Sequence, residues 1–497
     1  MVMKLKENKF VIKNIKVNAI LNVIYTLVNM LFPLLTYPYI SRILGATNLG
    51  KVNFFISVAN YAILFASLGL NTYGIRAIAK VRDDKMKLAK TTKELITLNM
   101  YITIVVMIIY ISLAVLVSKF RSNVPLVVIN GIWIITTPLG MNWLYSGLEQ
   151  YTYITKRTVF FKIVSLILIF VFVRTSSDYT NYAAILVFAN VGAYFLNYLN
   201  ANRIVPKYYK RDLEYKKHLK PTLILFASAL AISVYTNLDM IMLGFIRGDK
   251  QVGLYTVAVK AQTVLLSIVN ALSTVLLPRL SFYISQKRIK EFNRILRKSI
   301  AVILLLTISL SAFFIIVAPE CIAILGGKGY EGAILSMQIL MPILVISGFS
   351  NITGNQILIP QGKDVAFMKA VISGAVVAFL CNLILMEKYG AVGGSIATLI
   401  AEMTQMSIQV YYSWKVVHNN FSYQTVIKAV IATVIAVAVT ILCNTILKIG
   451  AFGKIIMDGI IYYFCYILIL KLLKEEYFLE LVNKILRRKK YGQRKNL

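Results

Sequence analysis

Seven charged residues interrupt apolar stretches of this sequence, where a charge is costly unless it faces a partner or a cavity. They are Arg42, Lys51, Lys162, Asp239, Lys260, Lys369 and Glu402. Cations in such positions can bind a phosphate, and carboxylates can bind a proton or Na⁺. Three of them, Lys51, Lys162 and Lys369, lie near the ends of their apolar runs. A lysine side chain there can extend until its charged end reaches water, which explains these residues as well. For the deeper Lys260 and Glu402, the alternative is a structural ion pair.

Motifs of enzymatic sites are missing from the sequence. It contains no HExxH, no GxSxG and no nucleotide-binding glycine loop, and its four cysteines show no CxxC spacing. Both histidines, His218 and His418, lie in short basic connections between apolar runs. We therefore expect a protein that is not an enzyme, with no catalytic residue, no metal site and no cofactor.

The apolar composition indicates an integral membrane protein. Hydrophobic residues make up 58% of the 497 residues, and the mean hydropathy is +0.73. The apolar runs reach the roughly 20 residues that cross a hydrocarbon layer of about 30 Å. The first run is too long for the core of a cleaved signal peptide and should remain as the first span. We expect fourteen spans in an all-α protein, near residues 15–40, 51–75, 94–118, 124–146, 157–174, 180–200, 221–245, 253–277, 299–318, 334–358, 368–386, 391–413, 425–446 and 455–473.

The net charge of +34 is unevenly distributed along the chain. Lysine and arginine gather in alternate connections, at 76–93, 203–220 and 279–298, and in the tail after residue 487. This is the positive-inside asymmetry of multispan membrane proteins, and it predicts that both termini are cytoplasmic. The asymmetry accounts for the charge, so we expect no nucleic acid partner.

A repeated pattern of glycines predicts two related halves. Leu-Gly followed by a second glycine occurs at Leu44, Gly45 and Gly50, and again at Leu243, Gly244 and Gly253. From the second glycine to the arginine that ends the following span, Arg76 or Arg279, is the same distance in both places. We expect six-span lobes at 1–200 and 201–414, two further spans at 415–474 and a basic tail at 475–497. Chance recurrence of glycine turns is the alternative.

Several segments with polar residues at defined points identify a family. They are FPLLTYPYISRILGATNLGKVNF from Phe32, ASLGLNTYGIRAIAKVRDD ending at Asp84, GLEQYTYITKRTVFFK from Gly147, YTNLDMIMLG from Tyr235, PQG at Pro360 and KYGAVGGSIATLIAE from Lys388. The sequence resembles bacterial Wzx-type polysaccharide repeat-unit flippases, of the multidrug/oligosaccharidyl-lipid/polysaccharide (MOP) exporter superfamily. It departs from many relatives at Met240, where they have a lysine.

The resemblance implies a MOP exporter fold with a central V-shaped cavity between the lobes. It further implies a carrier in the bacterial inner membrane that moves an undecaprenyl-pyrophosphate-linked oligosaccharide from the inner to the outer leaflet. The lipid tail would follow a groove along residues 425–473, and other polysaccharide-assembly proteins are candidate partners beside the lipid bilayer.

Four cations are our candidates for binding the pyrophosphate: Arg42, Lys260, Lys51 and Arg76. Arg42 is the first choice because it stands in the ISRILG segment that matches the family and because a guanidinium can hold phosphate oxygens bidentately. Its alternative role is that of an interfacial anchor.

Four further residues complete the expected site. Asp239 and Glu402 are the carboxylates expected to bind a proton or Na⁺, with pairing to neighbouring cations as the alternative. Pro33 and Pro38 each remove a backbone donor, so we expect them to bend the first span where it lines the cavity.

Two other functions compete with a flippase. A multidrug exporter on the same fold should carry acidic residues in its cavity, whereas the deep charges here have both signs. A membrane-bound polymerase or glycosyltransferase of the same pathway should show a large outer loop or an acidic catalytic motif, and the outer connections here are short.

Overall fold

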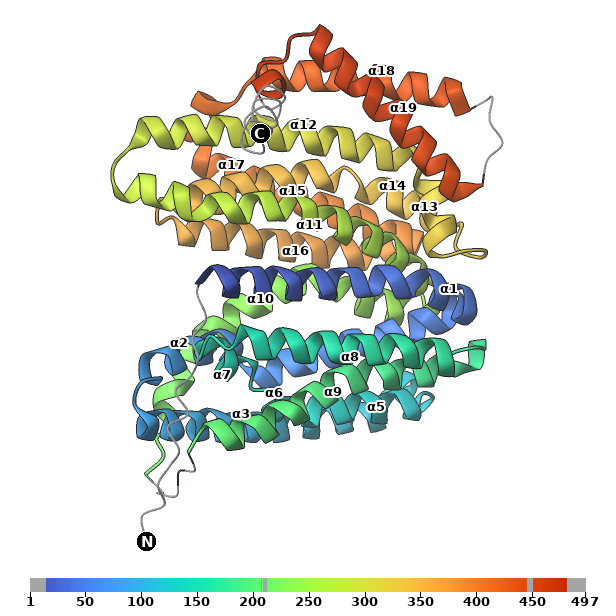
Figure 1. The fold of residues 1–497 in the computed structure, drawn as a ribbon. Helices are drawn as coiled ribbons and strands as arrows, with labels where there is room; N and C mark the ends of the chain where they lie inside the picture. Colours follow the sequence, from blue (N-terminus) through green and yellow to red (C-terminus); the bar gives the residue numbers. More distant parts are fainter. Residues whose placement is uncertain (1–14, 207, 209–211, 445–449, 481–497) are drawn as a thin grey trace, which may run out of the picture. The chain divides into compact units, whose positions relative to one another are not determined.

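The computed structural model describes residues 15–206, 208, 212–444 and 450–480, and all regular structure within these ranges is helical. By contacts between its residues the chain divides into two compact units, Met1–Gly244 and Phe245–Leu497 (Figure 1). This division falls later than the expected lobe boundary at residue 200. The helix that we expected to open the second lobe has most of its residues in the first unit. The lobe boundaries, which rest on the repeat, stay a prediction.

The first unit contains ten helices and a 3-10 turn in the described residues. They are α1 (Ile15–Ser67), α2 (Leu70–Val81), α3 (Lys85–Leu116), α4 (Ser118–Arg121), α5 (Val124–Ile135), α6 (Thr137–Gly140), α7 (Asn142–Gly147), α8 (Tyr151–Phe172), η1 (Ser176–Asp178), α9 (Tyr179–Ile204) and α10 (Lys216–Ile246).

The second unit continues with nine helices and a π-helical segment in the described residues. They are α11 (Asp249–Ser285), α12 (Ile289–Ile316), α13 (Ala318–Leu325), α14 (Ala333–Leu340), α15 (Ile343–Asn351), η2 (Ile352–Leu358), α16 (Asp364–Tyr389), α17 (Ala391–Asn420), α18 (Tyr423–Asn444) and α19 (Ala451–Leu472).

Helix α1 is a hairpin rather than one straight rod. The Tyr37 hydroxyl donates to Asn53 Oδ1 at 3.2 Å, although 16 residues of straight helix would separate them by about 24 Å. The chain reverses at Gly45, whose φ of 70° and ψ of 171° are not helical. Helix continues through Pro33 and Pro38. The reversal is therefore due to the glycine, and a bend at the prolines stays a prediction.

The same turn occurs once more between α10 and α11. Gly248 has a φ of 82° and a ψ of −180°, close to the values of Gly45. Only glycine adopts this conformation without strain. Gly244, which we had matched to Gly45, lies inside α10 instead, so that part of the sequence match was wrong. In the corrected alignment, one offset of 203 residues relates Gly45, Gly50 and Arg76 to Gly248, Gly253 and Arg279.

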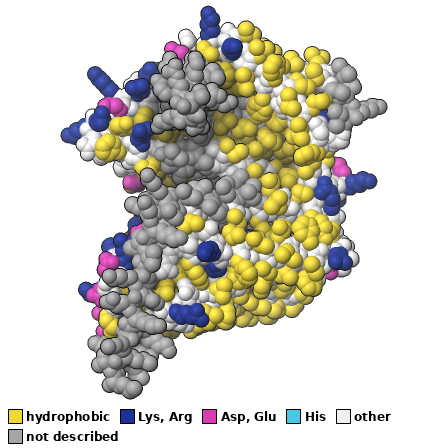
Figure 2. Space-filling view, in the orientation of Figure 1, with side chains coloured by type: hydrophobic (Ala, Val, Ile, Leu, Met, Phe, Trp, Pro, Cys, Tyr) yellow, Lys and Arg dark blue, Asp and Glu magenta, His cyan; other side chains and the backbone are white. Residues whose placement is uncertain are grey.

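Nine helical segments in the described residues are long and apolar enough to cross a membrane, or ten if the bent pair Val124–Ile135 and Thr137–Gly147 counts as one span. One of the nine, Phe32–Val81, covers the Gly45 hairpin and therefore includes residues of two expected spans. The count of fourteen stays a prediction. Apolar side chains cover the middle of the helices and charged side chains stand mainly near helix ends (Figure 2). Large apolar residues such as Ile108 and Phe464 are more than half exposed, as expected of surfaces in contact with lipid.

Contacts within each unit join connections that the sequence assigns to the same side of the membrane. On the expected outer side, the Asn48 amide donates to the Ser176 carbonyl at 2.7 Å in the first unit. On the expected inner side, Arg82 pairs with Glu149 at 2.7 Å. In the second unit, the backbone N–H of Ala391 donates to Gln251 at 2.9 Å, both on the outer side. These contacts support the order of the spans; which side faces the cytoplasm stays a prediction.

Within the second unit, helix α19 packs on α12 through hydroxyl groups. The Tyr462 and Tyr466 hydroxyls donate to the carbonyls of Ser309 and Leu305 on α12, at 3.0 and 2.8 Å. At the other end of α19, Lys454 forms an ion pair with Glu320 at 2.5 Å. The expected lipid-tail groove along α18 and α19 stays a prediction, and residues 445–449 and most of the basic tail lie outside the described residues.

Candidate functional site

Arg42 and Lys51 flank the glycine turn of α1. Arg42 is exposed and donates through Nη1 to the carbonyl of Pro38. Lys51 is half-buried, with its Nζ 5.1 Å from the centre of the Tyr179 ring. The turn packs against the connection between α8 and α9, where the Tyr39 hydroxyl donates to the Val173 carbonyl at 2.9 Å. Both cations thus lie at the expected outer end of the first unit.

Arg76 lies at the opposite end of the same unit. It is an exposed residue of α2, which follows the second arm of α1. That arm runs from the Gly45 turn to Ser67 and is roughly 30 Å long. One pyrophosphate therefore cannot contact Arg76 together with Arg42 and Lys51 in this structure. Lys260 is a half-buried residue of α11 and belongs to the second unit.

The two expected ion-binding carboxylates are both buried but belong to different units. Asp239 is 6% exposed on α10, in the first unit, and Glu402 is 7% exposed on α17, in the second. Helix α10 packs on the second arm of α1, where the Tyr61 hydroxyl donates to the Ser233 carbonyl at 2.8 Å. Burial of both carboxylates within apolar helices is the environment that an ion-binding role requires.

Glu402 shares one face of α17 with two amides, Gln405 and Gln409, at a spacing of three and seven residues. Gln409 Oε1 accepts hydrogen bonds from the hydroxyls of Ser350 and Thr353, at 2.9 and 2.8 Å. Thr353 lies in the π-helical segment η2, and such segments are rare and often occur at functional sites. The carboxylate stands out in the sequence, whereas this amide network does not.

A buried arginine that was not selected from the sequence is packed between helices of the first unit. Arg157, on α8, is 7% exposed. Its guanidinium donates to the side-chain oxygens of Asn197 and, at 3.2 Å, of Asn142. The side-chain amide of Asn197 in turn donates to the Gly140 carbonyl. The backbone carbonyl of Asn197 accepts from the Tyr145 hydroxyl at 2.5 Å.

No carboxylate pairs with Arg157 among the residues that the structure describes. Its partners are neutral amides and the ring of Tyr153, 6.0 Å from the guanidinium carbon. The positive charge is therefore uncompensated locally and can attract an anion. The segment GLEQYTYITKRTVFFK carried a weak signal, because Tyr151 and Tyr153 stand close to the arginine in sequence. Only the tertiary contacts with Asn142 and Asn197 show its burial.

A second buried cluster joins α2, α3 and the start of α10. Glu94 is fully buried, and its Oε1 accepts from the backbone N–H of Glu214 at 2.9 Å and from Lys217 Nζ at 3.2 Å. Its other oxygen lies 2.9 Å from His218 Nε2, and His218 Nδ1 lies 2.7 Å from the Tyr73 hydroxyl. This cluster fastens the beginning of α10 to the rest of the first unit.

Two family models match long parts of this chain. A model described as "Polysaccharide biosynthesis protein" matches residues 15–284, and one described as "Lipid II flippase MurJ" matches residues 203–462. Each match is longer than half of the chain.

Individual proteins agree with these matches. A protein of Escherichia coli (strain K12) named "Putative O-antigen transporter" is 27% identical over 410 residues, which cover 80% of this chain and 96% of that protein. A solved structure of the lipid II flippase MurJ in an inward closed conformation covers 94% of this chain and 100% of that chain, with 14% identity and a TM-score of 0.73. An inward-facing multidrug MATE family transporter of the MOP superfamily covers 82% and 99%, with 15% identity and a TM-score of 0.60. The chain therefore belongs to the polysaccharide biosynthesis protein family, and it is a multi-pass Wzx-type flippase with the MOP exporter fold.

Proposed function

We propose that this flippase moves an undecaprenyl-pyrophosphate-linked oligosaccharide from the inner to the outer leaflet of a bacterial inner membrane. Both termini would be cytoplasmic, and the substrate would leave chemically unchanged. The observation that carries this proposal is the match to the E. coli protein over 96% of its length, since its name assigns it to O-antigen transport. A multidrug exporter is the second candidate, but its support is fold similarity alone.

A simple test separates the two candidates. Deletion of the gene should make lipid-linked repeat units accumulate in the inner leaflet and should remove the surface polysaccharide. Unchanged polysaccharide together with increased sensitivity to cationic drugs would instead favour the multidrug exporter.

The pyrophosphate of the substrate needs more than one cation. Its charge of about −2 loses most of its water in a cavity, and at an effective dielectric near 20 each cation at about 4 Å returns about 4 kcal/mol. We assign Arg42 as the first of these cations and Lys260 as the second. Lys51, close to Arg42 at the same turn, can assist it; Arg76, at the other end of the unit, would meet the substrate only at a different stage of transport.

Substitutions test this assignment. Arg42→Ala should abolish surface polysaccharide while the protein still reaches the membrane, because a principal phosphate contact is lost. Arg42→Lys should be intermediate, because it keeps the charge but not the bidentate geometry. Lys260→Ala should be impaired. Normal export by a well-expressed Arg42→Ala variant would return Arg42 to the role of an interfacial anchor.

Energy coupling is assigned to Asp239 or Glu402. A chain that uses no nucleotide must draw on an ion gradient or the membrane potential, and a buried carboxylate that binds a proton or Na⁺ can bias the equilibrium between conformations. Asp239→Asn and Glu402→Gln should each be tested for the dependence of flipping on pH and on Na⁺. Retained flipping with unchanged ion dependence in both variants would exclude this mechanism.

A further inference from the structure

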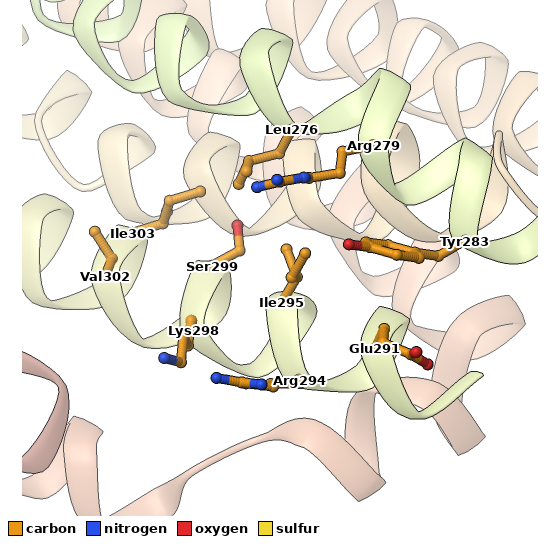
Figure 3. A pocket seen from close by; sticks show the side chains of 10 residues that line it. All are labelled: Leu276, Arg279, Tyr283, Glu291, Arg294, Ile295, Lys298, Ser299, Val302 and Ile303. Carbon is orange, nitrogen blue, oxygen red and sulfur yellow. The ribbon is translucent and has the colours of Figure 1, made fainter. Parts of the chain in front are cut away.

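An open cavity of about 540 Å³ lies in the second unit beside the hairpin of α11 and α12. Figure 3 shows Leu276, Arg279 and Tyr283 from α11 on its walls, facing a row of residues from α12. The hairpin turn, residues 286–288, belongs to one of the strongly basic connections that the positive-inside rule assigns to the cytoplasm. The cavity therefore lies where a membrane-spanning helix pair meets the basic face.

Its lining changes from charged to apolar with distance from the turn. On α12 the lining begins with Glu291, Arg294 and Lys298 and continues with Val302 and Ile303. All of these lie on one helical face, because they are spaced by three, four or one residues. A charged end and an apolar end fit a molecule with a charged head and a hydrocarbon tail.

Positive charge prevails at the charged end. The carboxylate of Glu291 is already paired with Arg288 at 2.7 Å, and Lys298 is paired with Glu480. Arg279 and Arg294, in contrast, make no hydrogen bond or ion pair within the part of the chain that the structure describes. Nor can side chains after Glu480 neutralise them, because residues 481–497 contain no aspartate or glutamate.

The cavity is not the result of a loosely packed hairpin. On their other faces α11 and α12 contribute to a tight core, in which Leu280, Phe292 and Leu296 are at most 1% exposed. Ser299, at the cavity floor, is also fixed, since its hydroxyl donates to Gln356 at 2.7 Å. The two arginines therefore project from a rigid support.

We propose that this cavity binds the phosphate headgroup of an anionic phospholipid from the leaflet on the basic side. Arginine is suited to a phosphate because its guanidinium donates in a planar fork, and basic pockets between spanning helices on the cytoplasmic side bind anionic lipid headgroups. The acyl chains lie along Leu276, Val302 and Ile303. We regard this lipid as distinct from the transported substrate, because every residue that lines the cavity belongs to one hairpin. Its binding can therefore be measured without transport.

The test uses the purified full-length protein in a mild detergent. Phosphatidylglycerol is titrated while the apparent melting temperature is followed, and lipid retained by the protein is counted by native mass spectrometry. Phosphatidylcholine and inorganic phosphate are the comparison ligands. We expect phosphatidylglycerol to raise the melting temperature of the wild type, and the other two ligands to have little effect.

The decisive variant is Arg279→Gln with Arg294→Gln. Its lipid affinity should fall by about tenfold or more, since two charge-assisted phosphate contacts are lost. The matched control is Lys287→Gln with Lys290→Gln, which removes the same charge from the same hairpin outside the cavity. It should bind lipid like the wild type. The double variant Arg279→Lys with Arg294→Lys should bind the lipid with intermediate affinity. This result would show that the loss of lipid affinity in the glutamine variant is not due to misfolding.

Two results would overturn the proposal. Equal retention of phosphatidylglycerol by the glutamine variant and the wild type would show that the arginines do not hold the lipid. An equal stabilisation by inorganic phosphate would show a site for free anions rather than for a lipid.

Discussion

Replacement of Glu94 by glutamine tests whether the buried cluster at the start of α10 stabilises the first unit. Glutamine has the same shape and can still accept the hydrogen bond from the backbone N–H of Glu214. It loses the charge that faces His218 and Lys217 at 2.9 and 3.0 Å. The variant therefore isolates the electrostatic part of the cluster.

The expected loss follows from the burial of each partner. His218 is 4% exposed, and a charge-assisted hydrogen bond in such a place contributes about 1.5–3 kcal/mol. Lys217 is 44% exposed, so water replaces most of its interaction and we assign it about 0–1 kcal/mol. The sum of about 1.5–4 kcal/mol corresponds to a fall of roughly 3–16 °C in melting temperature for a unit of this size.

The assay is thermal unfolding of the purified protein in detergent. Glu214→Gln is the matched control, because this carboxylate is 66% exposed and its side chain pairs with the same lysine at 3.3 Å. It should melt like the wild type. His218→Gln should melt close to Glu94→Gln, and the double variant should lose much less than the sum of the two. A Glu94→Gln variant with the wild-type melting temperature would refute the reasoning.

Three further predictions concern topology, pH and packing. With the native cysteines replaced, single cysteines are placed at Thr47 and Lys328 on the expected outer side and at Asp83 and Gln286 on the expected inner side. An impermeant thiol reagent applied to intact cells should label the outer positions and not the inner ones. Labelling of an inner position would contradict the span order. Hydrogen bonds from the Tyr208 hydroxyl and Lys90 hold the pKa of Asp212 below its ordinary value of 3.8. Its carboxylate therefore stabilises the fold at neutral pH, and this contribution is lost as the pH falls below about 4; Asp212→Asn should weaken the acid dependence of the melting temperature. Gly244→Ala would place a methyl group 2.2 Å from Phe54 and should destabilise the first unit by about 1–3 kcal/mol, measured by the same melting assay.

Apolar runs predicted most of the helices, because a run of about 20 apolar residues has few stable alternatives in lipid. The reversal near Gly45 was also visible, since Leu-Gly followed by a short polar stretch interrupts the hydrophobic pattern. In its repeat, only the partner of Gly45 was misplaced, by four residues. The sequence alone did not show that Gly248, and not Gly244, has the positive φ.

Burial of polar residues could not be predicted in the same way. Arg157, Glu94 and His218 all stand in or beside basic connections, where an exposed charge and a buried one look alike in sequence. Their burial depends on partners 40 or more residues away, such as Asn197 for Arg157. Deep charges in the middle of a span, such as Glu402, were easier to select because the local sequence already makes them exceptional.

The buried charge of Arg157 does not depend on acidity. An arginine keeps its proton at every pH at which the protein is folded, and its partners Asn142 and Asn197 do not titrate at all. The local electric potential that Arg157 creates is therefore constant, whatever the state of the proton gradient.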